Sequence, residues 1–162
     1  MPASRREGAL LELKRRLELI RPDYPAEGSS PFWTNPGAVL LGEAPTMGSE
    51  GDPQFAIAII VGGSTDQQQG VSERYISKLR VSVQAHVALS VEDAWLVVER
   101  MLADIKRAVE GDADLTLGGW CSTQPPGIVR TGSNAAPRED GSMSVGASVD
   151  YELSFDDLWG RP

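Results

Sequence analysis

The stretch ERYISKLRVSVQAHVAL, residues 73–89, decides the fold of this 162-residue chain. Apolar residues recur at every second position from Leu79 onward, and most residues between them are polar. A period of two is typical of a β-strand that buries one face. We therefore predict a long strand over Glu73–Leu89. Its buried face consists of Leu79, Val81, Val83, Ala85, Val87 and Leu89, and its polar face of Lys78, Arg80, Ser82, Gln84 and His86.

A helix is predicted directly after this strand. Ser90 is the expected N-cap, with Asp93 at the third position beyond it, and Gly111 is the expected end of the helix. Apolar residues between them recur at spacings of three and four, which is typical of a helix with one buried side. The predicted buried stripe consists of Ala94, Val98, Met101, Leu102, Ile105 and Val109.

The residues upstream predict a further helix and two strands. Residues 5–20 have an apolar stripe at helical spacing, and Pro22 cannot continue the helix. Val39–Gly42 is predicted to be a short strand. Phe55–Val61 is apolar without alternation, which indicates a strand that is central in a sheet or buried on both faces. The stripe of the first helix consists of Leu10, Leu13, Leu17 and Ile20.

The residues downstream predict a hairpin. Ile128–Thr131 is a possible strand, Ala136–Ser142 has the Pro, Asp and Gly of a turn, and Met143–Phe155 alternates as a long strand. The chain is thus predicted to be one α+β domain, 1–162, with a mixed, mostly antiparallel sheet, two main helices packed on it and long surface loops. The predicted core includes Val83, Val87, Val98, Met101, Ile105, Val149 and Tyr151.

Composition excludes some classes of protein. The net charge is -8 and the pI is about 4.6, so duplex nucleic acid is repelled at long range, although a channel through which DNA slides is compatible with this charge. Cys121 is the only cysteine, so an internal disulfide is excluded. The most apolar run, Phe55–Val61, is too short to span a bilayer, and we expect a soluble protein without membrane contact.

No motif for catalysis or cofactor binding is found in the sequence. His86 is the only histidine, and we expect it to be solvated or at an interface because no nucleophile motif accompanies it. Cys121 is expected to be a small buried thiol, and one cysteine with one histidine is too few ligands for a usual zinc site. The glycines at Gly62 and Gly63 match neither phosphate-loop pattern. We therefore expect no enzyme activity, metal or cofactor. Four carboxylates are expected to be solvated: Asp112, Asp114, Asp156 and Asp157.

Three long polar loops are predicted at residues 21–37, 43–54 and 62–72, and long loops are often binding or assembly elements. An aromatic side chain in a loop either packs on the domain's own core or serves as a docking anchor. The candidate interface residues are Phe32, Trp33 and Trp159. The candidate lumen or interface loop contains Asp66, Gln67, Gln68, Gln69 and Glu73.

The chain resembles the tail terminator proteins of long-tailed bacteriophages, also called tail completion or head–tail joining proteins. The resemblance lies in the order of elements: the helix ALLELKRRLELI, the strand FAIAIIV with the polar segment GGSTDQQQGVSE, the strand RYISKLRVSVQAHVAL leading into the helix VEDAWLVVERMLADIKRAV, and the final strand SMSVGASVDYELSF. The family has no catalytic motif, so no site residue is carried over.

The resemblance implies a homo-oligomeric ring of six copies that caps the tail tube, ends its polymerisation and joins it to the neck or connector protein. DNA would pass through the lumen without specific binding. The protein would act in the virion, at the tail–neck junction, after assembly in the host cytoplasm. Two alternatives stay open: another neck or connector ring protein, and a small soluble enzyme with an unreadable site.

A lumen that DNA crosses should not hold phosphate tightly, because many lysine contacts would slow passage. The stretch Gly62–Glu73 has Asp66, Glu73, three glutamines and no basic residue. The loop before it has Glu43, Glu50 and Asp52. One hypothesis is that one or both loops line the channel or its mouth; the alternative is that they are only solvated.

Overall fold

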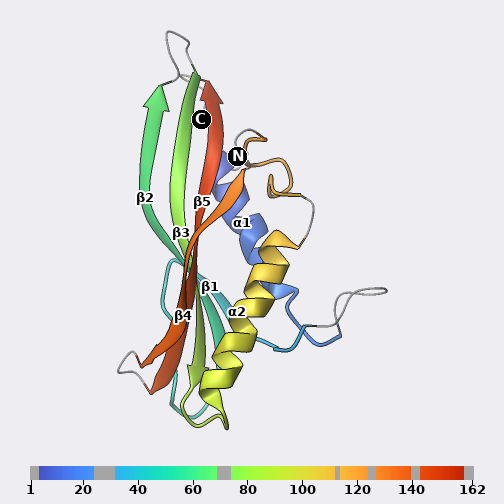
Figure 1. Cartoon of the computed structure of the whole chain (residues 1–162), viewed down its shortest axis with the longest axis vertical. Helices are drawn as coiled ribbons and strands as arrows, with labels where there is room; N and C mark the ends of the chain where they lie inside the picture. The colour runs from blue at the N-terminus through green and yellow to red at the C-terminus, as the bar shows by residue number, and fades with distance from the viewer. Residues whose placement is uncertain are drawn as a thin grey trace.

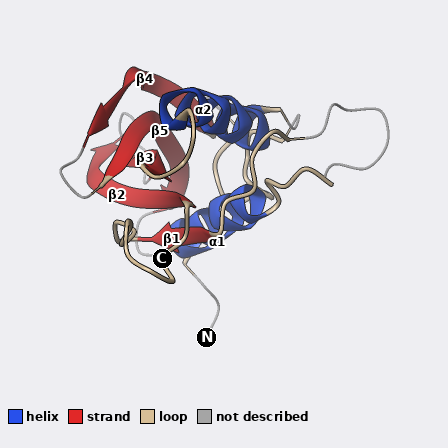
Figure 2. Ribbon diagram, turned by 90° about the horizontal axis from the view of Figure 1, so that it is seen from below, coloured by secondary structure: helices blue, strands red, loops and turns tan. Residues whose placement is uncertain are grey.

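Five strands form one sheet, and two helices pack against one of its faces (Figures 1 and 2). The structure, a computed structural model, describes residues 4–23, 32–68, 74–111, 114–123, 127–139 and 143–158. The helices are α1 (Arg5–Glu18) and α2 (Ala94–Glu110). The strands are β1 (Ala38–Leu41), β2 (Phe55–Gln68), β3 (Arg74–Ala88), β4 (Ile128–Glu139) and β5 (Ser144–Leu158).

The sheet is mixed and mostly antiparallel, as predicted. Its strand order is β1-β2-β3-β5-β4. Only β1 and β2 run parallel, and the other three pairs are antiparallel. The long strand that the alternating pattern predicted, β3, lies in the middle between β2 and β5. The apolar start of β2 lies between β1 and β3, in agreement with the prediction of a central strand.

The core lies between the sheet and the helices. The alternating apolar side chains of β3 and β5 face the buried stripes of α1 and α2. All seven residues predicted for the core are buried: Val83, Val87, Val98, Met101, Ile105, Val149 and Tyr151. Leu89 is an exception to the predicted strand face, because β3 ends at Ala88 and the Leu89 side chain is 44% exposed.

The two helices begin differently. Ser4 caps α1: its Oγ accepts a hydrogen bond from Glu7 N, and the Glu7 carboxylate accepts one from Ser4 N, which completes a capping box. The prediction that Ser90 caps α2 is wrong, because the N-cap is Asp93, with φ 54° and no side-chain cap bond. Residues after β3 instead form a turn, with Val91 N donating to Ala88 O, that carries the chain from the sheet to the helix layer.

The ends of three strands extend beyond their predicted limits, and the predicted loop at 62–72 is wrong where the structure describes it. β2 continues to Gln68, and Asp66 lies opposite Ser77 of β3. The register shifts between Val61 and Ser64, as in a β-bulge at the two glycines. Polar strands are possible here because this arm of the sheet extends past the helices (Figure 1) and its backbone pairing requires no apolar side chains. The extended strands are β2, β4 and β5.

Candidate assembly surface

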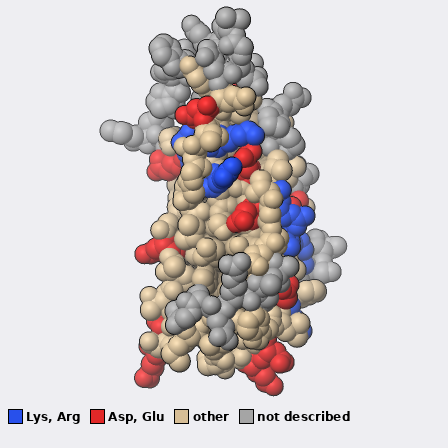
Figure 3. Space-filling model, turned by 60° about the vertical axis from the view of Figure 1, so that its left-hand side comes forward, with Lys and Arg blue, Asp and Glu red and all other residues tan. Residues whose placement is uncertain are grey.

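The face of the sheet away from the helices is mostly polar. At one level across it, Ala58, Gln84, Ser148 and Asn134 lie on four neighbouring strands. Nearer the arm, Lys78 Nζ lies 2.8 Å from Glu152 Oε1. Figure 3 shows positive and negative side chains close together in the upper half of this side, and carboxylates at its lower end. A mostly polar face with paired charges suits contact with water or with a polar partner.

His86 is on this face but is not solvated, which corrects one of the two predicted settings. Its side chain is 7% exposed, and its Nε2 lies 3.2 Å from Gln84 Oε1. The residue opposite it on β5 is Gly146, where an added Cβ would lie 3.5 Å from the imidazole Nδ1. The glycine leaves room for the ring to lie against the sheet, so the alternating pattern alone did not reveal its burial.

The sheet has two open edges in the part of the chain that the structure describes. On one edge, β1 covers β2 only from Ala56 to Ile59, where Gly42 N donates to Ile59 O at 2.8 Å. Beyond that point β2 is paired on the β3 side, and its side chains from Val61 to Gln67 are exposed. The other edge is β4, which pairs with β5 on its inner side.

The predicted interface aromatics Phe32 and Trp33 have different roles. Phe32 is buried, and the guanidinium carbon of Arg107 lies 4.4 Å from the centre of its ring. The Trp33 indole is 64% exposed. Phe32 therefore packs on the domain's own core, and Trp33 is available to a partner. Three other predicted residues, Gln69, Glu73 and Trp159, lie outside the described residues, as does the side chain of Gln68.

A buried carboxylate that the sequence pattern did not indicate fixes the backbone at Trp33. Asp104, on α2, is 2% exposed, and its Oδ2 accepts bonds from Trp33 N at 2.9 Å, Thr34 N at 2.8 Å and Thr34 Oγ1 at 2.7 Å. Burial of a carboxylate is costly unless it is hydrogen-bonded, and here three donors meet it. The signal in the sequence was a lone aspartate beside Ile105 within the apolar stripe of the helix.

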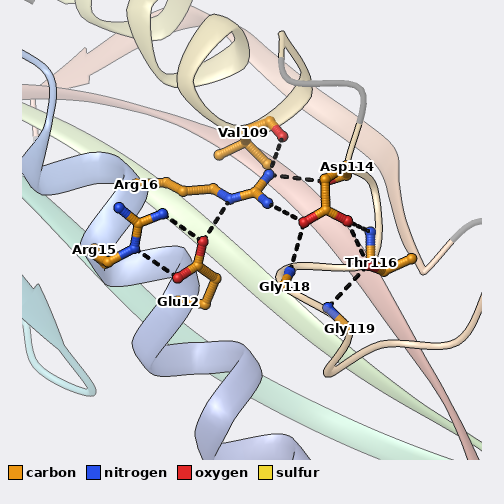
Figure 4. A network of polar contacts seen from close by, with 8 residues as sticks. All are labelled: Glu12, Arg15, Arg16, Val109, Asp114, Thr116, Gly118 and Gly119. Atoms are coloured by element: carbon orange, nitrogen blue, oxygen red, sulfur yellow. Dashed lines mark hydrogen bonds and ion pairs between the residues drawn. The ribbon is translucent and has the colours of Figure 1, made fainter.

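A second polar network joins α1 to the loop after α2 (Figure 4). Arg16 is 6% exposed; its Nη1 donates to Asp114 O at 3.0 Å, and its Nη2 lies 2.9 Å from Asp114 Oδ2. The Thr116 hydroxyl, and next the Gly118 and Thr116 amides, lower the pKa of Asp114 to about 2. The Asp114 side chain, predicted to be a solvated charge, is 36% exposed and in addition makes these contacts, which the prediction did not include. The network is structural, because it joins elements of one chain.

The potential nucleophiles are not activated. Cys121 is buried, as predicted, and burial raises the pKa of its thiol to about 12. Burial also raises the pKa of the Tyr151 hydroxyl. A reactive thiol requires a lowered pKa, so Cys121 does not have the character of a catalytic nucleophile. In the described ranges, no three His, Cys, Asp or Glu side chains form a group that could hold a metal ion.

The lower end of the molecule has exposed apolar side chains. Leu89 and Met143, at 44% and 65% exposure, are joined by a backbone hydrogen bond from Leu89 N to Met143 O. Trp95 and Leu96, in the first turn of α2, are about half exposed. The sequence placed Leu89 and Met143 on the apolar faces of strands, and the structure corrects both, because each lies just past the end of its strand.

Comparison with known proteins does not identify the chain. No protein-family model matches it, and no curated protein matches it. Among the helices that the structure describes, none is long and apolar enough to cross a membrane.

Proposed function

We propose that this chain is a structural virion protein whose copies form a ring, expected to contain six, that caps a phage tail tube, ends its polymerisation and joins it to the neck. The observation that supports this best is an open sheet that, among the described residues, has an edge on each side with no further strand beside it. β2 and β4 run in opposite directions because three antiparallel pairings separate them. Copies placed side by side therefore meet through two different edges, and such heterologous contacts close into rings when the rotation allows.

The helices favour one orientation of the subunit in such a ring. They add a layer to one face of the sheet only (Figure 2). Since the outer circumference of a ring is longer than the inner one, the helix layer lies outside and the polar sheet face lines the channel. Lys78 on that face is paired with Glu152, which limits its attraction for phosphate. DNA could then pass without being held, since affinity for the backbone comes mainly from unpaired cations.

Partners at the two ends of the ring would be the tail tube and a neck or connector protein. The apolar side chains of Leu89, Trp95, Leu96 and Met143 support a protein contact at the lower end, because exposed apolar patches commonly mark such sites. The site of action would be the tail–neck junction of the virion, after assembly in the host cytoplasm. The unactivated Cys121 supports a structural role over an enzymatic one.

Sedimentation of the purified chain between micromolar and near-millimolar concentration tests the proposal. We expect a concentration-dependent oligomer, visible as rings by negative-stain electron microscopy, that binds one end of purified tail tubes. A chain that remains monomeric throughout and does not bind tubes would contradict it. Rings that do not bind tubes but bind a connector would favour another neck component.

A further inference from the structure

The edge of β2 from Val61 to Gln68, here called the upper β2 edge, has an unused backbone ladder. Its side chains from Val61 to Gln67 are exposed, and β1 ends at the level of Ile59. The upper β2 edge contains no proline and no lysine, which are residues that commonly block an open strand edge, whereas β4 contains Pro137. Its N–H and C=O groups are therefore available to a further strand.

The register identifies which groups point outward. Ile59 O accepts from Gly42 N, so the backbone groups of Ile59 face away from β3. Backbone N–H and C=O groups that face away from β3 recur at every second residue of β2. Across the bulge, the residues paired on β3 show which residues of β2 continue this alternation. Val83 lies opposite Ile59, and Leu79, four residues along β3, lies opposite Ser64. Ser64 thus directs its N–H and C=O to the open edge.

We propose that the upper β2 edge pairs, antiparallel, with β4 of a second copy, so that a continuous backbone ladder joins neighbouring subunits. The inference rests on the proposed ring and names the joint within it. The two strands have the opposite directions that such a pair requires. Charge does not select the partner strand, because Arg6 Nη2 already lies 3.2 Å from Asp66 Oδ1 and Arg130 Nε lies 3.5 Å from Glu110 Oε1. A pair of two β2 edges would be isologous and would end at a dimer, whereas a pair of β2 with β4 is heterologous and can continue into a ring.

The position of β1 sets a stagger between the copies. Through the registers, Ile128 is level with Ser64 and Glu139 with Phe55, so the middle of β4 is level with residues 59–60 of β2. The free stretch is centred at residues 64–65, which is about four residues higher along β3, because Ile59 lies opposite Val83 and Ser64 opposite Leu79. β1 lies below the incoming strand and is not part of the joint. Each copy therefore contributes four neighbouring strands to the shared sheet: β2, β3, β5 and β4.

This stagger is compatible with closure. Four residues correspond to about 14 Å along a strand and four strands to about 19 Å across a sheet. A closed sheet with that ratio of stagger to width tilts its strands by about 35° from the ring axis, at the lower end of the range of closed barrels. The joint that the free edge allows is therefore one that can close into a ring.

Cysteine crosslinking tests the joint. Ser64 and Ser133 are both exposed, and both lie opposite buried core residues, Leu79 and Val149, so their side chains are on the helix side of the sheet. The variant with both Ser64→Cys and Ser133→Cys, treated with a short bismaleimide, should give covalent multimers larger than a dimer. Each single variant should give none. The unsubstituted chain is a control, because its Cys121 is buried.

A proline variant tests the ladder itself. Ser64→Pro removes an N–H that faces the open edge, whereas Ser64→Ala keeps it. Ser64→Pro should sediment as a folded monomer, and Ser64→Ala as the oligomer.

Two results would overturn the inference. Crosslinked dimers from the Ser64→Cys single variant would show that two β2 edges pair with each other. Rings of the double cysteine variant that do not crosslink would show that subunits meet elsewhere. Those rings would leave the proposed function intact, whereas a monomer at every concentration would overturn both. If Ser64→Pro does not fold, the crosslinks decide.

Discussion

At the scale of single residues, buried polar groups hold the surface segments in place. Asp104 fixes the backbone beneath the exposed indole of Trp33, which a partner would then meet already ordered. Arg16 joins α1 to the loop at Asp114. An ordered aromatic side chain loses less entropy on binding than one in a free loop. These contacts depend on residues far apart in the sequence, so the sequence alone could not show them.

Asp114 predicts a dependence of stability on acid pH. Its pKa is about 2 in the folded chain and 3.8 in the absence of the network, so its contribution is complete above about pH 4 and is lost as the pH falls through 2. Asp114→Asn should lower the melting temperature at pH 6, and the difference from the unsubstituted protein should shrink toward pH 2. Thermal melts over this range check it, with the exposed Asp23→Asn as control. A difference that does not vary with pH would contradict this account.

At the scale of elements, α1 is held by contacts that its apolar stripe does not describe. Gly8 is buried against the ring of Trp120, and α1 also contacts α2 through the Arg16 network. The sequence predicted this helix from leucine spacing, and the structure confirms it. The sequence did not indicate that a glycine inside it is required for packing, because glycine in a helix is usually only unfavourable.

Gly8→Ala should therefore destabilise the protein. A Cβ at this position would lie 2.3 Å from Trp120 Cδ2, so the ring would have to move. We expect the free energy of unfolding to fall by about 1–3 kcal/mol, the usual effect of overpacking, although alanine at an open helical site stabilises by about 1 kcal/mol. Urea unfolding measures this change. Gly63→Ala, where no atom lies within 4 Å, is the matched control. A more stable Gly8→Ala variant would show that the ring does not restrict this position.

At the scale of the whole molecule, the sheet has one face covered by helices, one mostly polar face on which Met47 packs against Ala56 and Ala88, and two open edges in the described residues. This arrangement changes the lumen hypothesis. Asp66 is in a strand, and its carboxylate contacts Arg6 of α1 at 3.2 Å, on the helix side. In the proposed ring, the channel is lined instead by the opposite face, which includes Ser82 and Gln84.

Lysine substitutions on the two faces distinguish these positions. Ser82→Lys should slow DNA ejection from assembled particles at low salt, because an unpaired cation in the channel would attract phosphate. Asp66→Lys, on the helix side, should leave ejection unchanged. Ejection kinetics at two salt concentrations measure both effects. If Asp66→Lys slowed ejection and Ser82→Lys did not, the arm formed by β2 and β3 would line the channel instead.

The sequence by itself determined the class of fold, because burial of one face leaves a period in the chain. The alternation in residues 73–89 and in the last strand predicted two paired strands, and the spacing of leucines and valines predicted both helices. All seven predicted core residues are buried for the same reason. The residue types and their spacing also showed that the sequence contains no recognisable catalytic motif.

Only the tertiary structure decided where polar residues pair. The arm after Val61 is a strand because β3 lies beside it, and no apolar pattern records backbone pairing. His86 and Asp104 are buried although each is polar, because Gly146 leaves space for one and three donors surround the other. Periodicity reports which side chains leave water. Hydrogen bonds between distant segments, and the edges that remain open, follow from how the elements pack in space.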